Sequence, residues 1–184
     1  MKLIPQSISE VIVIEPKVHY DERGYLIETY REDLLIEALG YKVNFIQDNE
    51  SKSNFKGVLR GLHYQLPPFT QSKLVRVIEG KVLDISVDIR RDSITFGQHV
   101  SVEISAQNKR QIFIPQGFAH GFVVTSDEAI FSYKVDQYYS AAHNRGIAYD
   151  DNDLGIDWEL PKEDLIISKA DQGHPNFANN INLL

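Results

Sequence analysis

Residues 73–90 read KLVRVIEGKVLDISVDIR and contain two β-rich runs that meet at Glu79, Gly80 and Lys81. Valine and isoleucine dominate both runs, and β-branched residues favour strands. A glycine between two such runs is typical of a hairpin turn. The stretch therefore predicts two antiparallel strands joined near Gly80, and with them an all-β fold.

The segments on either side extend this pattern. Residues 99–105, HVSVEIS, place valines 100 and 102 and isoleucine 104 on one face and polar residues on the other, as a half-buried strand requires. Further short strands are predicted in SEVIVIEPKV (9–18), QIFIP (111–115), GFVVT (121–125) and EAIFSYKV (128–135). Turn signals at 107–108, 117 and 126–127 separate them. Short strands punctuated in this way indicate a β-sandwich or barrel.

Helical signals are confined to two places. Residues 31–40, REDLLIEALG, have clustered leucine and isoleucine and end in glycine, which predicts a short helix. Residues 161–171, PKEDLIISKAD, predict a helical turn and then an irregular arm. No repeat or linker divides the chain. We therefore expect a single domain over residues 1–184, with an N-terminal strand arm and a polar C-terminal tail.

The composition narrows the classes of function. Of 184 residues, 42% are hydrophobic and 24% charged, which is ordinary for a globular protein, and none is cysteine, so disulfides and thiol chemistry are excluded. The formal net charge of −7 argues against nucleic-acid and membrane-surface binding, although local arginines still permit a small anionic ligand. The sequence has no apolar run that could span a bilayer and no signal-peptide pattern, so a cytoplasmic protein is predicted.

Two of the six histidines stand apart from the others. His63 lies in GVLRGLHYQ (57–65) and His120 in IPQGFAHGF (114–122), where apolar residues and glycines surround them. From the residues alone, His63 is a packed core histidine, a metal ligand or a general base, and His120 is structural or functional. The remaining histidines have polar surroundings and are predicted to be solvated: His19, His99, His143 and His174.

The chain resembles the cupin superfamily in both of its motifs. Gly57 is followed by five residues and His63, while Pro115, Gly117 and His120 match the second motif. Two usual ligand positions differ, because glutamine and lysine stand at 65 and 73 in place of histidine and glutamate. A lysine ammonium has no free lone pair for a metal and repels a cation. We therefore expect a cupin pocket without a metal or other cofactor, in which a lysine takes over the electrostatic role.

The resemblance becomes closer when further segments are included. FIQDNESKS (45–53), GVLRGLHYQ, residues 71–97, IPQGFAHGF, YKVDQYYS (133–140) and GIDW (155–158) occur in the order and spacing of the dTDP-4-dehydrorhamnose 3,5-epimerase family. This resemblance implies a metal-free, cupin-type jelly-roll β-sandwich with a few short helices. It also implies a homodimer and a dTDP-sugar substrate. The implied reaction inverts carbons 3 and 5 of dTDP-4-dehydro-6-deoxy-D-glucose, giving dTDP-4-dehydro-L-rhamnose on the way to dTDP-L-rhamnose.

The resemblance also implies roles for four side chains. Both carbons lie next to a ketone, so inversion requires a base, an acid on the opposite face and a cation beside the enolate oxygen. These roles fall to His63, Tyr133 and Lys73. Asp171, in ISKAD (167–171), is expected to orient His63, as carboxylates commonly orient a base histidine.

Some positions near these residues are less defined. Ala170 replaces a lysine of the family tail motif, and Lys169 lies one place away from it. Asp84 either pairs with Lys73 or is a solvated carboxylate at a strand edge. Asn144 stands where members of the family often carry an acidic residue, directly before Arg145.

Substrate binding is likewise assigned by resemblance. The implied contacts are Arg23, Glu28, Gln47, Asn49, Arg60, Lys73, His120, Tyr138, Tyr139 and Lys169. The fork of Arg60 suits a diphosphate, and Tyr138 or Tyr139 is expected to stack on thymine. Strict strand alternation would put Arg60 and His63 on opposite faces, so a bulge at Gly61 is expected to bring them into one pocket.

Three alternatives to the 3,5-epimerase remain open. One is a related dTDP-4-keto-sugar epimerase that inverts one carbon, or a ketoisomerase. Another is a non-catalytic cupin that binds a sugar nucleotide, which would have no need of an acid such as Tyr133. The third is a metal-dependent oxygenase or isomerase, which Gln65 and Lys73 oppose.

Overall fold

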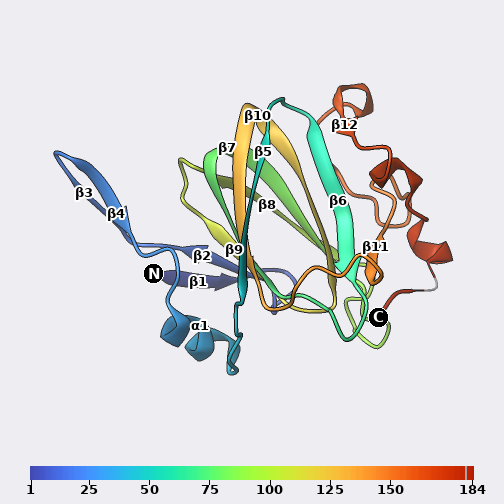
Figure 1. The fold of residues 1–184 in the computed structure, drawn as a ribbon, viewed down its shortest axis with the longest axis horizontal. Helices are drawn as coiled ribbons and strands as arrows, with labels where there is room; N and C mark the ends of the chain where they lie inside the picture. Colours follow the sequence, from blue (N-terminus) through green and yellow to red (C-terminus); the bar gives the residue numbers. More distant parts are fainter. Residues whose placement is uncertain (181) are drawn as a thin grey trace.

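The computed structural model describes residues 1–180 and 182–184, and its central feature is a large, strongly curled β-sheet (Figure 1). The strands run in the order β1-β2-β9-β7-β10-β6-β11, while β5, β8 and β12 pair with β10, β7 and β6. The bounds of the sheet strands are β1 Lys2–Pro5, β2 Ile12–Glu15, β5 Gln47–Ser53, β6 Val58–Gln65, β7 Lys73–Asp88, β8 His99–Ser105, β9 Gln111–Ile114, β10 Phe118–Val135, β11 Asn144–Gly146 and β12 Ile166–Ile167.

Two long strands carry the sheet from one layer to the other. The first part of β7 pairs with β9 and its second part with β8. In the same way β10 pairs with β6 through its first part and with β5 through its second. At these changes of neighbour the sheet curls over on itself, so that its strands form two layers (Figure 1). The result is the predicted cupin-type jelly roll.

The predicted hairpin at Gly80 is wrong, because β7 is one continuous strand of 16 residues. The turn signal at Ser126 and Asp127 likewise falls inside the 18-residue β10. The two strands pair along both halves, with a register shift between Val124 and Ala129 opposite Gly80. There the Lys81 amide donates to Ser126 Oγ at 2.8 Å. The Ser126 and Asp127 signal therefore lies in a bulge of β10, and a second register shift between Ile130 and Phe131 adds one residue to β7 close to Gly80.

The core lies between the two layers. The predicted alternation of β8 is confirmed, because Val100, Val102 and Ile104 are buried and join a cluster with Phe131 of β10. A second cluster, which includes Trp158, packs the tail against the outer side of β6, β7 and β10. Together the clusters fix the long strands whose side chains form the candidate site.

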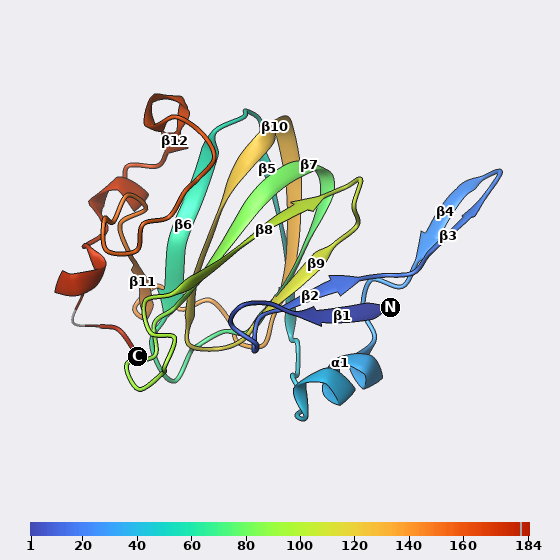
Figure 2. The ribbon, with the colours of Figure 1, turned by 180° about the vertical axis from the view of Figure 1, so that it is seen from behind.

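The N-terminal region lies partly outside the barrel. β3 (Val18–Asp21) and β4 (Gly24–Ile27) form a separate two-stranded hairpin that projects from the body of the molecule (Figures 1 and 2). The predicted helix is confirmed as α1, Glu32–Leu39. No helix in the described part of the chain is long and apolar enough to cross a membrane.

The C-terminal tail runs beside β6 (Figure 1). It contains the 3₁₀ turns η1 (Lys162–Asp164), η2 (Asp171–Gly173) and η3 (Phe177–Asn179), so the predicted helical turn is confirmed. Between η1 and η2, β12 pairs in parallel with β6, opposite Val58 and Leu59. This pairing carries the following residues, up to Asp171, along the strand that holds His63.

Candidate active site

A bulge in β6 brings Arg60 and His63 into one site. His63 pairs with His120, and Arg60 with Phe122, so three steps along β6 match two steps along β10. Gly61 lies between them with φ +119°, and a Cβ there would lie 2.6 Å from Gly121 Cα. Only glycine fits this conformation and this close approach. The predicted bulge is confirmed.

The bulge opens onto a cavity of about 570 Å³ between β6, β7, β10 and the tail. Its polar lining includes the ionisable side chains Arg60, His63, Lys73, His120, Tyr133 and Asp171. Its apolar wall includes Phe122 and Phe131, whose rings stack with centroids 4.0 Å apart. All four side chains with a predicted catalytic role thus border the same space, which is large enough for a sugar.

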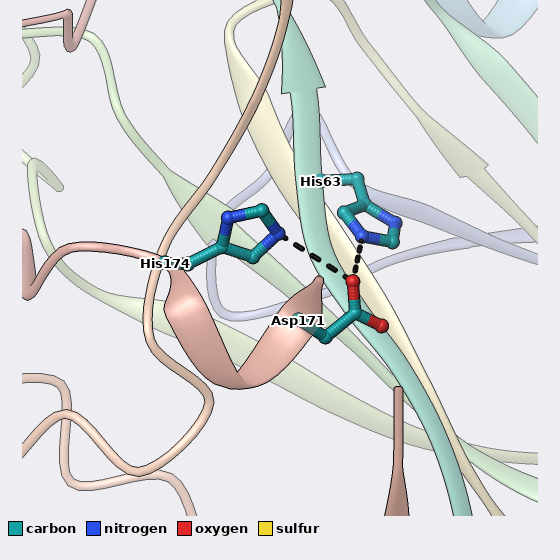
Figure 3. A group of neighbouring side chains, drawn as sticks. All are labelled: His63, Asp171 and His174. Atoms are coloured by element: carbon teal, nitrogen blue, oxygen red, sulfur yellow. Dashed lines mark hydrogen bonds and ion pairs between the residues drawn. The ribbon is translucent and has the colours of Figure 1, made fainter. Parts of the chain in front are cut away.

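His63 and Asp171 form a close pair at one side of the cavity (Figure 3). His63 Nε2 lies 2.7 Å from Asp171 Oδ1, and the Gly61 amide donates to Asp171 Oδ2 at 3.4 Å. Burial alone would raise the pKa of Asp171, but its hydrogen bond and charge interaction with His63 outweigh this and lower the pKa. The carboxylate therefore stays ionised and accepts a hydrogen bond from His63 Nε2–H, which leaves His63 Nδ1 as the nitrogen with a free lone pair.

Lys73, His120 and Asp84 form a second connected group. His120 Nε2 lies 2.8 Å from Asp84 Oδ2, and His120 Nδ1 lies 3.4 Å from Lys73 Nζ. Burial lowers the pKa of Lys73 to about 8, against the opposing charge of Asp84. Burial also lowers the pKa of His120, so this ring is neutral and accepts from the ammonium while it donates to Asp84.

This geometry corrects the expectation for Asp84. Asp84 is fully buried, so a solvated edge carboxylate is wrong. Its hydrogen bond goes to His120, whereas Lys73 feels only its charge. Asp84 Oδ1 has no hydrogen-bond partner among the described residues. A buried carboxylate with an unpaired oxygen lowers the stability of the fold. The negative charge of Asp84 nevertheless acts on the Lys73 ammonium, which lines the cavity.

Tyr133 lies on β10, opposite Val75 of β7 and Asn49 of β5. Burial raises the pKa of its phenol, with the charge of Arg60 opposing the change. A raised pKa keeps the phenol protonated near neutral pH. Tyr133 is therefore held in the form that can donate a proton into the cavity.

Two of the predicted substrate-binding residues continue one wall of the cavity. Gln47, Asn49 and Ser51 alternate along β5 and so share a face, and Ser51 lines the cavity. Gln47 Nε2 donates to Asn49 Oδ1 at 2.6 Å. Both amides thus lie on the same face of β5 as Ser51 but beyond the cavity, where the rest of a longer ligand would lie.

The other predicted contacts lie outside the cavity. Arg23 is at the tip of the β3–β4 hairpin, where it pairs with Asp21 and is 84% exposed. Glu28 follows β4 and contacts Arg31. The exposed side chains of Tyr138, Tyr139 and Lys169 do not line the cavity either.

Gln65 is held by the backbone and does not border the cavity. Its Nε2 donates to the carbonyls of Phe69 and Tyr138, and its Oε1 accepts from the Ser140 amide. Cupins usually have a metal ligand at this position, whereas this chain has an amide whose hydrogen bonds hold the loop after β10 in place.

The expectation that His174 is solvated is also wrong. Its side chain is 18% exposed and lies beside His63, with ring centroids 5.6 Å apart (Figure 3). Burial lowers its pKa, and the charge of His63 lowers it further. A histidine in a polar tail is normally predicted to lie on the surface. Nothing in the neighbouring residues indicates that a 3₁₀ turn packs this one against β6.

A jelly roll with histidine, lysine and tyrosine around one cavity defines the class as a cupin-type enzyme suited to proton transfer. Comparison with known proteins narrows this class. The sequence profile of "dTDP-4-dehydrorhamnose 3,5-epimerase" matches residues 5–179, and the chain belongs to this family of isomerases.

Individual relatives agree closely with that assignment. A Shigella flexneri protein named dTDP-4-dehydrorhamnose 3,5-epimerase is 50% identical over 97% of both chains. The crystal structure of the Elizabethkingia anophelis NUHP1 enzyme of the same name has a TM-score of 0.94 and 47% identity, and the match covers 99% of this chain and 98% of that one. A Legionella pneumophila epimerase, solved in complex with dTDP-4-keto-L-rhamnose, has a TM-score of 0.92 and 46% identity, with 97% and 93% covered. The predicted family, fold and enzyme class are therefore confirmed.

Proposed function

We propose that this epimerase acts by proton transfer at the carbons next to the C4 ketone of dTDP-4-dehydro-6-deoxy-D-glucose, with His63 as base and Tyr133 as acid. The observation that carries the proposal is the 2.7 Å pair of His63 and Asp171, which borders the same cavity as Lys73 and Tyr133. A base, its orienting carboxylate, a cation and a phenol are the groups that an enolate mechanism needs.

The reaction would proceed through an enolate. His63 Nδ1 takes the proton from the carbon, and the C–H electron pair moves into the ketone, whose oxygen becomes negative. The Lys73 ammonium stabilises that oxygen, while Asp171 stabilises the imidazolium. Tyr133 then gives its proton to the opposite face of the carbon, which inverts the centre. His63 then releases its proton to solvent and Tyr133 takes one up, which restores both groups. Repetition at the second carbon would then complete the conversion to dTDP-4-dehydro-L-rhamnose.

We also propose that the nucleotide extends from the cavity along β5. Arg60 lines the cavity and its guanidinium reaches β5, where it donates to Ser53 Oγ and the Lys52 carbonyl. A fork at the cavity wall suits a diphosphate. Gln47 and Asn49 lie further along the same face of β5, and Tyr138 or Tyr139 would stack on thymine. His120 would contact the sugar, and Lys169 lies beside Ser168 of the cavity wall.

The position of Arg23 and Glu28 supports a homodimer. Their segment projects from the barrel and exposes Tyr20 (72%) and Leu26 (70%). A projecting apolar hairpin is typical of a segment covered by a second copy. In a homodimer, one chain would present Arg23 and Glu28 to the other chain's nucleotide. In the N-terminal region the free sheet edge lies at β1, since β2, in the stretch 9–18, already pairs with β1 and β9. A cytoplasmic location and a single domain stay predictions.

The test is incubation with dTDP-4-keto-6-deoxyglucose in heavy water, read by NMR at each carbon. We expect deuterium and inverted configuration at both carbons 3 and 5. Inversion at one carbon alone would support the mono-epimerase alternative. Binding without exchange would support a non-catalytic cupin. Light scattering of the same sample should give twice the chain mass, and a single-chain mass at micromolar concentration would contradict the homodimer.

A further inference from the structure

His174 is not needed by the mechanism above, yet it is built into the same corner of the fold (Figure 3). Its ring packs against Gly146 of β11, which pairs with His63. A Cβ at position 146 would overlap the His174 ring, so the glycine makes the room that the ring fills. The His174 side chain is therefore held in place beside the base rather than left on the surface.

The nitrogen that this packing aims at Asp171 is unsatisfied. His174 Nε2 is buried and has no hydrogen-bond partner among the described residues, although it lies 3.5 Å from Asp171 Oδ1. A buried imidazole nitrogen without a partner is costly unless something else occupies it at times.

The three ligand atoms in this corner have the spacing of a metal site. His63 Nε2, His174 Nε2 and Asp171 Oδ1 all lie within 4.8 Å of one another. Zinc binds imidazole nitrogen and carboxylate oxygen at about 2.0–2.2 Å in a tetrahedron, which puts neighbouring ligand atoms roughly 3.3 Å apart. The distances of 2.7 Å and 3.5 Å to Asp171 Oδ1 bracket this value.

We propose that His63, Asp171 and His174 form an inhibitory site for a divalent transition metal, with Zn²⁺ as the best match. Three protein ligands leave the fourth tetrahedral position for water from the cavity, which His63 and Asp171 both border. Two imidazoles and one carboxylate favour zinc over magnesium or calcium, which prefer oxygen ligands alone. The set is distinct from the cupin motif positions, of which it shares only His63.

Inhibition follows from the chemistry of His63, and so this part rests on the proposed function. A metal on Nε2 uses that nitrogen's lone pair, so the ring proton moves to Nδ1. Nδ1 then has no lone pair for a substrate proton, and Asp171 is no longer free to stabilise an imidazolium. Zinc would therefore stop proton abstraction without touching the nucleotide contacts.

The test uses full-length protein freed of metal, with Co²⁺ as a spectroscopic probe and Zn²⁺ as the competitor. We expect one Co²⁺ per chain with the visible absorption of a tetrahedral site, displaced by Zn²⁺, and Zn²⁺ inhibition over the same concentration range. His174→Ala should raise the Zn²⁺ concentration for half-inhibition at least about 10-fold, relative to its own uninhibited rate, and weaken Co²⁺ binding equally. His99→Ala, which removes a histidine outside the cluster, should match the unaltered protein in both measurements.

Equal half-inhibition of the unaltered protein and His174→Ala would overturn the proposal, as would a Co²⁺ spectrum that persists in His174→Gln. Circular dichroism shows whether either variant has lost its fold. If His174→Ala is unfolded, His174→Gln replaces it in both measurements. If Co²⁺ binding requires His174 but Zn²⁺ leaves turnover unchanged, the metal site stands and His63 is not the base. That outcome separates a failure of the proposed function from a failure of the site.

Discussion

His63 Nε2 lies 2.7 Å from Asp171 Oδ1, although the two residues are 108 positions apart in the chain. Their meeting depends on β12, which pairs with the start of β6 and brings the tail to the bulge at Gly61. The polar tail thus supplies the group that orients the proposed base.

Replacing Asp171 tests this pairing. Asp171→Asn should lower kcat roughly 10²-fold or more, because the amide cannot stabilise an imidazolium. It should also lower the free energy of unfolding at pH 7 by about 1–3 kcal/mol. The folded pKa of Asp171 is lowered, so its stabilisation is present above its unfolded value of about 3.9 and fades as pH falls through the folded value. Urea titrations of both proteins at pH 7 and in acid check this, and a stability difference that persists unchanged in acid would contradict it.

Lys73 is predicted to support turnover at a cost in stability. Lys73→Met should slow turnover roughly 10²- to 10³-fold, since the enolate loses its cation. The folded pKa of Lys73 is about 8, below its ordinary value, so below pH 8 the buried charge opposes folding. Lys73→Met should therefore be more stable at pH 7 by on the order of 1–3 kcal/mol, and the gain should shrink between pH 8 and about 10.5. The unaltered enzyme's kcat should fall as pH rises through about 8. Thermal unfolding and a pH–rate profile measure both effects, and a variant that is less stable at pH 7 would refute this account of the ammonium.

Sequence patterns predicted the strand segments, the helix and the bulge, but not how the long strands continue. A glycine or Ser-Asp signal marks both a hairpin and a bulge, and only the partner strand decides between them. Because β7 and β10 pair with each other along both halves, each turn signal became a bulge. The same limit applies to Asp84, whose partner His120 lies on the neighbouring strand.

The candidate site was predictable to a different degree in its two halves. Resemblance to the family named the side chains that line the cavity, because motif residues keep their order. It did not predict the environment of His174. The burial of this ring depends on its contact with Gly146, which lies 28 positions earlier in the chain. It also did not indicate that Arg23 and Glu28 lie away from the cavity, since a hairpin's direction is set by packing.

Gly61 is predicted to tolerate no side chain. Gly61→Ala should lower the free energy of unfolding by roughly 2–4 kcal/mol, because its φ is +119° and its Cβ would overlap the backbone of β10. Turnover should fall as well, since the bulge positions both Arg60 and His63. Chemical denaturation provides the measurement, with Gly173→Ala as the matched control, because a Cβ at 173 meets nothing within 4 Å. Equal losses in the two variants would count against the bulge.

Chelation is predicted to leave turnover intact. Lys73 stands where a cupin metal ligand is usual, and Gln65 is bound to the backbone. Exhaustive treatment with a chelator should give a rate equal to or above that of the untreated enzyme, the increase reflecting removal of any inhibiting zinc. Loss of activity that a divalent ion restores would show that the reaction needs a metal.

The most direct test of the central claim is hydrogen exchange by His63→Ala and Tyr133→Phe with dTDP-4-keto-6-deoxyglucose in heavy water, followed by NMR. His63→Ala should show neither turnover nor deuterium uptake, because no enolate forms without the base. Tyr133→Phe should keep some exchange at a carbon whose configuration does not invert, because the base remains while the acid is gone. Both variants should bind thymidine nucleotide with near-normal affinity. The loss of a general base should lower the rate roughly 10²-fold or more. A His63→Ala enzyme that retained a tenth of the activity would therefore contradict the account.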